Sequence, residues 1–174
     1  MAFEDTQITI NDLSFNIEGK TLLHNTNLSL NKDGITVLLG ANGAGKTIFL
    51  KLLTGLLTPC SGSISLEGGN LSIKTRAFVS QEPVILRRTV LKNMLFVLEK
   101  ITSEKSTQAK ELLSLMGLDK KENQNALTLS AGEKQRLCLA RAIITDPEIL
   151  LLDEPTANIE PNSTTLIEKY LIQK

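Results

Sequence analysis

A glycine-rich segment, residues 40–47, has the residue types and the spacing of a phosphate-binding loop. It reads Gly-Ala-Asn-Gly-Ala-Gly-Lys-Thr and matches the pattern G-x-x-x-x-G-K-[ST]. In such a loop backbone N–H groups surround the phosphates, the lysine reaches the β- and γ-phosphates, and the threonine hydroxyl is a ligand for Mg²⁺. The alternative is a glycine-rich turn that binds nothing. The pattern favours nucleotide binding, and the candidate residues are Gly40, Ala41, Asn42, Gly43, Ala44, Gly45, Lys46 and Thr47.

The segments on either side of the loop would position it. Residues 35–39, Ile-Thr-Val-Leu-Leu, form a short apolar run that predicts a buried parallel strand. Residues 46–57 carry apolar side chains at helical spacing, which predicts a helix. The first turn of that helix would direct its N–H groups and the positive end of its dipole at an anion. Strand, loop and helix therefore follow one another in the order that phosphate binding requires.

Two acidic residues, Asp153 and Glu154, follow an apolar run at 149–152 that predicts another buried strand. An acid at the carboxyl end of such a strand can hold the Mg²⁺ that a phosphate loop needs, which is the role expected of Asp153. Glu154 is a candidate general base that orients or deprotonates the attacking water. An Asp-Glu pair at a strand end is also a common turn. The phosphate loop elsewhere in the chain favours the catalytic interpretation.

A third segment, Ser130 to Glu133, opens an apolar helix that ends near Asp146-Pro147. Ser-x-x-Glu is a capping box, in which each side chain accepts from a backbone N–H group of the other residue. That structural role explains Ser130 and Glu133 but leaves Gly132 unexplained, because glycine is a poor helix former. A glycine in the first turn allows close approach to the helix N-terminus, which favours an anion. The two interpretations combine into a capped helix aimed at a phosphate.

Composition limits the class of protein. A chain of 174 residues fits one domain, and a formal net charge of zero gives no reason to expect a nucleic-acid partner. The apolar runs are far shorter than the ~20 residues needed to cross a bilayer, and the N-terminus lacks a hydrophobic signal core. Cys60 and Cys138 form neither a disulfide framework nor a metal site, which indicates reduced thiols in a cytosolic protein.

The remaining sequence suggests how the chain is organised. Apolar residues alternate with polar ones near the N-terminus, which predicts an antiparallel sheet with one covered face. Residues 77–80 predict a short core strand. Helical patterns begin at Thr89 and at Ser103, the second with an N-cap at Ser103 and a stop at Gly117. Residues 162–174 are amphipathic and predict a helix. The alternating positions are Ile8, Ile10, Leu13, Phe15, Ile17, Leu28, Leu30, Ile64 and Leu66.

Four segments together resemble the ATP-binding cassette (ABC) ATPases over essentially the whole chain. They are the loop at 40–47, Gln81 after a strand, Leu-Ser-Ala-Gly-Glu at 129–133 and Leu-Leu-Leu-Asp-Glu-Pro at 150–155. The signature segment, residues 129–136, separates this family from other phosphate-loop ATPases. The resemblance implies an α/β fold: a P-loop NTPase core with an N-terminal antiparallel β subdomain and a helical insertion. Residues 1–174 would form a single ABC ATPase domain, with the helical subdomain at 84–127.

The resemblance also implies a mechanism in which two chains pair head to tail and enclose two ATP molecules. Ser130, Gly132 and Glu133 would lie at the nucleotide of the partner, and Gln81 would contact Mg²⁺ and the water while its loop meets a membrane subunit. Residues 156–160 match the D-loop, which lies across the dimer interface. We therefore expect Lys46, Gln81 and Glu154 to be catalytic, and Thr47, Gln81 and Asp153 to hold Mg²⁺. The expected partners are transmembrane permease subunits and a second copy of the chain.

Some positions depart from the family pattern. Ile48 stands among the nucleotide-binding residues where a second hydroxyl is usual, Ala131 replaces a common glycine, and Glu133 replaces a common glutamine. The sequence stops at Lys174, before the strand that carries the switch histidine, so the C-terminal part of the usual cassette is missing. The one histidine, His24, lies in the N-terminal sheet. We expect ATP binding, with weak or absent hydrolysis by this chain alone.

Three functions are compatible with these observations. The first is the ATP-hydrolysing subunit of an ABC transporter, an importer that works on the cytoplasmic face of the cell membrane. The segment 81–88 resembles its counterpart in importers of tungstate-like oxyanions. The second is a soluble ABC ATPase without a transport role, although the chain has neither long heptad repeats nor basic linkers. The third is a truncated nucleotide-binding fragment without turnover.

Overall fold

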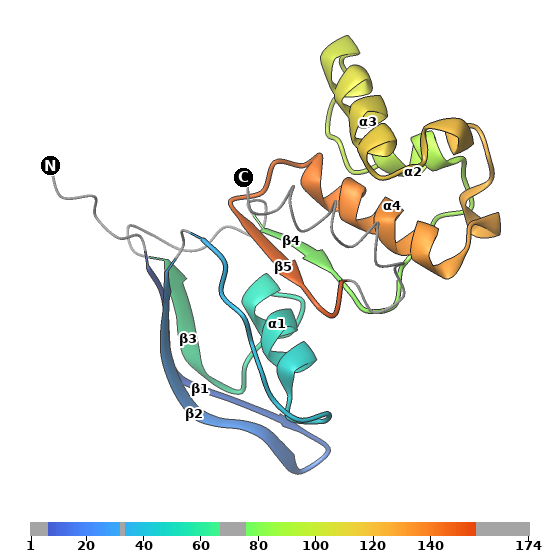
Figure 1. Cartoon of the computed structure of the whole chain (residues 1–174). Helices are drawn as coiled ribbons and strands as arrows, with labels where there is room; N and C mark the ends of the chain where they lie inside the picture. The colour runs from blue at the N-terminus through green and yellow to red at the C-terminus, as the bar shows by residue number, and fades with distance from the viewer. Residues whose placement is uncertain (1–6, 32–33, 67–75, 156–174) are drawn as a thin grey trace, which may run out of the picture. The chain divides into compact units, whose positions relative to one another are not determined.

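The computed structural model describes residues 7–31, 34–66 and 76–155. The chain divides into two compact units, residues 1–76 and 77–174, whose elements are labelled in Figure 1. Two predicted segments, the D-loop at 156–160 and the helix at 162–174, lie outside the described residues.

The first unit contains a three-stranded antiparallel sheet. Its strands are β1 (Gln7–Ile17), β2 (Lys20–Asn31) and β3 (Ser61–Leu66), in the order β2-β1-β3. Side chains of a strand alternate between the two faces of its sheet, and the central strand β1 buries one set: Ile8, Ile10, Leu13 and Phe15. The predicted antiparallel sheet with a covered face is thus confirmed. Ile17 and Leu28 were expected on that face but are exposed.

The buried apolar positions of β1 switch from even to odd residue numbers between Ile10 and Leu13, and a bulge at Asp12 is the reason. The φ of Asp12 is 48°, and the pairing of β1 with β2 and with β3 shifts register at this point. A bulge adds a residue to one strand, so Ile10 and Leu13 are both buried although they are an odd number of residues apart. The Asp12 N–H donates to Asn27 Oδ1, and Asn27 Nδ2 donates to Asp12 Oδ1, both at 2.9 Å.

The helix predicted after the glycine-rich loop is α1 (Lys46–Thr54), shown in cyan in Figure 1. It ends three residues before the predicted end at 57. Gly55 adopts a φ of 75° and its N–H donates to Leu52 O at 3.0 Å, which closes the helix in a left-handed cap that glycine favours. Phe49, Leu52 and Leu53 are buried, as the helical spacing predicts.

Residues 35–39 are not the buried strand that their composition predicts. They have no strand assignment, and Ile35, Val37 and Leu39 are 65%, 69% and 86% exposed. The three strands of the first unit pair with one another, and none of them pairs with this run. A strand needs a neighbour for its N–H and C=O groups, which an apolar composition cannot supply. The prediction was therefore wrong for this segment.

The second unit combines two strands with a group of helices. The strands β4 (Arg76–Val79) and β5 (Ile149–Leu152) are hydrogen-bonded neighbours, and the Asp153 N–H donates to Val79 O at 2.9 Å just beyond β5. Both were predicted, with bounds one residue different for β4. The helices are α2 (Val90–Leu95), α3 (Ser103–Leu115) and α4 (Ala131–Ile143), with 3₁₀ turns η2 (Asp119–Lys121) and η3 (Ala126–Thr128).

Two helix boundaries differ from the prediction. The pattern beginning at Thr89 gives a helix that stops at Leu95, although apolar residues continue to Ile101. The N-cap of α3 is Thr102 and not Ser103, because the Thr102 hydroxyl accepts from the Lys105 N–H at 3.2 Å.

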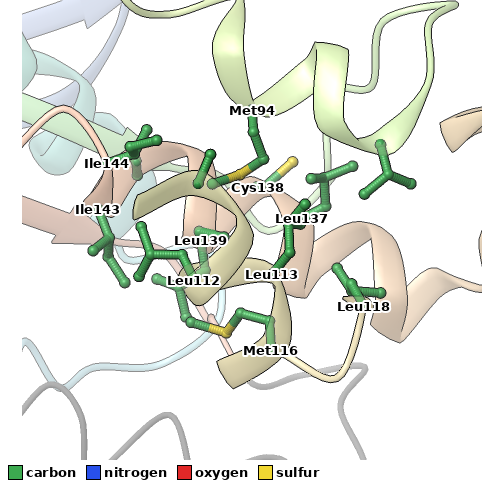
Figure 2. Close-up of a cluster of buried hydrophobic side chains, with 14 of the residues drawn as sticks. Met94, Leu112, Leu113, Met116, Leu118, Leu137, Cys138, Leu139, Ile143 and Ile144 are labelled. Atoms are coloured by element: carbon green, nitrogen blue, oxygen red, sulfur yellow. The ribbon is translucent and has the colours of Figure 1, made fainter. Parts of the chain in front are cut away.

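The core of the second unit lies where α2, α3 and α4 pack together. Figure 2 shows side chains from all three helices in one cluster. Several of them are fully buried, including Met94, Leu113, Leu137 and Leu139. Burying such a side chain contributes about 1.5–3 kcal/mol. This core packs α4 against α2 and α3, and the signature segment lies at the start of α4.

Candidate active site

The glycine-rich loop contains two glycines in the left-handed backbone conformation and a lysine that donates to the loop backbone. Gly43 and Gly45 have φ values of 80° and 91°, which L side chains rarely adopt. The Ala44 N–H donates to Ala41 O at 3.2 Å, which closes a turn. Lys46 Nζ donates to Gly40 O at 2.7 Å and to Ala41 O at 3.0 Å. A lysine ammonium has three N–H donors, so one stays available for a phosphate oxygen.

The N-terminus of α1 fits an anion. Gly45 occupies the N-cap position and provides no side-chain cap, and the first turn contains no acidic residue. The first N–H groups of a helix have no partner within the helix, so they can donate to a phosphate. Residues 41–44 are exposed, and a Cβ placed on Gly43 would have no atom within 4 Å.

The two acids expected to be catalytic follow β5, and Gln81 joins them. Gln81 Nε2 donates to Glu154 Oε2 at 2.8 Å, although the residues are 73 positions apart. Asp153 is only 6% exposed, whereas Glu154 is exposed. Glu154 has a φ of 47°, a strained conformation for a side chain of its size, and such strain is concentrated at functional sites. The second unit thus brings together an amide, a buried carboxylate and an accessible carboxylate.

The predicted capping box of α4 is present. The Glu133 N–H donates to Ser130 Oγ at 3.3 Å, and the Ser130 N–H donates to Glu133 Oε2 at 3.0 Å. The other oxygen of Glu133 lies 2.5 Å from Lys121 Nζ. The Lys121 hydrogen bond, followed by the one from Ser130, holds the pKa of Glu133 below its ordinary value. Glu133 is therefore ionised at neutral pH, and Lys121 balances its charge.

The predicted site residues fall into two groups. Residues 40–48 lie in the first unit, and Gln81, the segment 130–133 and the acids at 153–154 lie in the second. Sequence reasoning missed two residues near the second group, Lys121, which contacts Glu133, and Gln135, which contacts Ser80 beside Gln81. Lys121 was part of a polar stretch without a motif, and Gln135 gave no signal beyond its place within the signature segment. Gln135 is 1% exposed, and its Nε2 donates to Ser80 O at 3.1 Å.

Comparison with known proteins identifies the family. The family model of the ABC transporter matches residues 23–157. The chain belongs to the ABC transporter family. It is 34% identical over 171 residues to the tungstate uptake system ATP-binding protein TupC of Peptoclostridium acidaminophilum, which covers 95% of this chain and 80% of TupC. It is 38% identical over 161 residues to the aliphatic sulfonates import ATP-binding protein SsuB 1 of Nocardia farcinica, covering 92% of this chain and 63% of that protein.

Solved structures agree with this ABC family assignment. The ATP-bound bacterial Atm1-family ABC exporter matches 97% of this chain and 32% of its own, with a TM-score of 0.85 at 20% identity, which supports the fold alone. The cbiO1 protein of Clostridium perfringens, part of the ABC transporter complex cbiONQ, matches 98% of this chain and 74% of its own, with a TM-score of 0.79 at 25% identity. The predicted fold class is thus confirmed. The chain is an ABC ATP-binding subunit, and such subunits are ATPases.

The side chains predicted to hold Mg²⁺ have oxygen donors of the kind that this ion prefers. Within the described residues no group of three or more His, Cys, Asp or Glu side chains could hold a metal. Mg²⁺ beside a nucleotide needs fewer protein ligands, because phosphate oxygens and water complete its octahedral shell. The predicted ligands are hard oxygen donors, the Thr47 hydroxyl in the first unit and the buried Asp153 carboxylate in the second.

Among the helices of residues 7–31, 34–66 and 76–155, none is long and apolar enough to cross a bilayer.

Proposed function

We propose that this chain is the ATP-hydrolysing subunit of an ABC importer, and that ATP binding pairs two copies head to tail. The hydrogen bond of 2.8 Å between Gln81 and Glu154, beside the buried Asp153, carries this proposal. It places a neutral amide against the exposed carboxylate that would accept a proton from water. Residues 1–174 would act as a single ABC domain, with the helical subdomain at 84–127.

Each proposed site residue has a chemical role in hydrolysis. The loop N–H groups at 40–47 and Ile48 would bind the triphosphate of ATP, and the free N–H of Lys46 would stabilise charge on the γ-phosphate. Glu154 would accept the proton of the attacking water, and Gln81 would hold that water in line. When bound, Mg²⁺ would neutralise phosphate charge, with Thr47 and Asp153 as its ligands.

The proposed dimer would use the N-terminus of α4. Ser130, Gly132 and Glu133 would face the ATP bound by the partner subunit, where the helix dipole favours the γ-phosphate. The capping box holds this helix end in place, and Lys121 offsets the carboxylate that would otherwise repel a phosphate. The loop at 81–88 would contact the permease subunits, so we propose that the chain works on the cytoplasmic face of the cell membrane.

Support for an importer comes from the relatives. TupC is named for tungstate uptake and SsuB 1 for import of aliphatic sulfonates. Both cargoes are small oxyanions, so we propose an oxyanion of the tungstate type as the transported substrate. Two other functions from the sequence, a soluble ABC ATPase and a nucleotide-binding fragment without turnover, are outcomes of the experiment below.

The decisive experiment measures Mg-ATP binding by calorimetry and dimerisation by gel filtration. Lys46→Ala should weaken ATP binding about 10- to 100-fold, because it removes a charge-assisted hydrogen bond worth about 1.5–3 kcal/mol. Lys51→Ala is the matched control, since Lys51 lies on the same helix α1 away from the loop and should leave affinity unchanged. Glu154→Gln should bind ATP normally, stop hydrolysis and elute as a dimer with ATP.

The outcomes separate the alternatives. No ATP binding by the unaltered chain would refute the proposal as a whole. Binding without a Glu154→Gln dimer and without turnover would leave a nucleotide-binding fragment. Normal turnover with no co-purifying membrane protein from native membranes would favour the soluble ATPase.

A further inference from the structure

Helix α4 holds both ends of the loop that carries Gln81. Gln135 Nε2 donates to Ser80 O at 3.1 Å, immediately before Gln81. Arg141 Nη2 donates to Val84 O at 2.8 Å, and Cys138 Sγ lies 3.6 Å from the same oxygen. Gln135, Cys138 and Arg141 are three residues apart in turn, so they lie on one side of the helix.

Packing of the core does not explain why the side chain of Gln135 carries an amide group. Its side chain is 1% exposed, and its Oε1 has no hydrogen-bond partner within the described residues. A buried polar atom without a partner costs free energy, so an apolar side chain of similar size would suit this core better. Only the amide nitrogen can donate to the Ser80 carbonyl, which fixes the orientation of the group. A glutamine at this position therefore provides a hydrogen bond to Ser80 O that an apolar side chain could not make.

We propose that Gln135 is a positioning residue, which ties the signature helix α4 to the backbone before Gln81 and so sets Gln81 against Glu154. Val79, the residue before Ser80, also connects this backbone to the acids after β5, because its carbonyl accepts from the Asp153 N–H at 2.9 Å. A shift of α4 at its nucleotide-facing end would then move Ser80 and change the Gln81–Glu154 contact of 2.8 Å. The catalytic consequence rests on the proposed function, whereas the mechanical link does not.

The test is Gln135→Met, which keeps the length and volume of the side chain and removes its donor. Gln108→Met is the matched control, because it makes the same substitution on α3, away from the loop. The first readout is the NMR order parameter of the Gln81 and Glu82 backbone amides. We expect it to fall from about 0.85, the value of rigid backbone, to about 0.6 in Gln135→Met, with no change in Gln108→Met.

The second readout distinguishes positioning from a structural role. Relative to the ATP turnover of the unaltered chain, which we expect to be weak, kcat should fall about 10- to 100-fold in Gln135→Met with KM unchanged, because small misplacements of catalytic groups have effects of this size. The melting temperature should change little, since removal of the unpartnered Oε1 offsets the loss of the hydrogen bond to Ser80 O. A melting temperature that falls in step with activity would assign Gln135 to structure and overturn the proposal.

Arg141 provides a second route to the same answer if Gln135→Met does not fold. Arg141→Met should loosen the loop at Val84, and Arg141→Lys should restore its order, because lysine retains a donor. Unchanged order parameters of the Gln81, Glu82 and Val84 backbone amides in all of these variants would overturn the proposal. If the unaltered chain fails to bind ATP, the proposed function fails, and the order parameters still decide whether Gln135 positions the loop.

Discussion

Removing the cation of Lys121 is expected to destabilise the start of α4. Its Nζ lies 2.5 Å from Glu133 Oε1, and the two side chains are 36% and 17% exposed. Ion pairs open to solvent contribute about 0.2–1 kcal/mol. The short contact and the partly buried carboxylate place this pair at the upper end, so we expect a coupling free energy of about 1 kcal/mol. Lys121→Met should lower the free energy of unfolding by roughly that amount.

A double-mutant cycle with Glu133→Gln measures the coupling. Glutamine also serves at the third position of a capping box, so this variant keeps the hydrogen bond to the Ser130 N–H and loses only the charge. Urea unfolding of the four proteins, followed by circular dichroism at low salt, gives the coupling free energy. High salt should reduce it, because the pair is partly open to solvent. Lys120→Met is the control, since Lys120 is exposed on the same 3₁₀ turn.

The pH dependence provides an independent check. Folding lowers the pKa of Glu133, chiefly through Lys121, so the folded state binds a proton less readily than the unfolded state. The resulting stability is complete above the unfolded pKa of about 4.3 and is lost as the pH falls through the lower folded pKa. Lys121→Met should therefore lose less stability on acidification than the unaltered chain. A coupling below about 0.3 kcal/mol, or identical acid dependence, would refute this reasoning.

Two further predictions concern backbone strain and thiol reactivity. Gly62→Ala should lower the free energy of unfolding by about 3 kcal/mol, because its Cβ would lie 2.4 Å from Asn11 O at a φ of 85°; Gly117→Ala, with a φ of 66° and open space around its Cβ, should cost about 1 kcal/mol. Equal losses of unfolding free energy in the two variants, measured by urea denaturation, would contradict the clash between the added Cβ of residue 62 and Asn11 O. Burial raises the pKa of the Cys138 thiol, so a thiol reagent at neutral pH should modify only the exposed Cys60, and both thiols should react in urea. Rapid reaction of two thiols in the folded chain would show that α4 is less well packed than described.

Local features were predicted well from the sequence. The start of α1 at Lys46 and the capping box of Ser130 and Glu133 follow from residue types a few positions apart. Such features depend on hydrogen bonds and φ preferences within one turn, so the neighbouring residues contain the necessary information. The buried face of β1 was also predicted, although the bulge at Asp12 that aligns Ile10 with Leu13 was not.

Features that depend on distant partners were predicted less well. The apolar run at 35–39 has the composition of a buried strand, yet it is exposed in the described structure. Composition measures how well a segment suits a sheet, and pairing depends on another segment being in register with it. The contact between Lys121 and Glu133 was missed for a similar reason, because a lysine and a glutamate can each be stable without pairing with one another, and no local pattern indicates that these two meet.

The sequence alone determined which chemical groups this ABC subunit has and the backbone shape that presents them, since these depend on neighbouring residues. Only the tertiary structure decided that Gln81 meets Glu154 across 73 positions and that Gln135 reaches Ser80 across 55. Hydrogen bonds act over about 3 Å, and bringing groups that far apart in the chain within this distance requires a packed core. In the second unit that core is the cluster around α4, which connects the signature segment to the proposed catalytic residues.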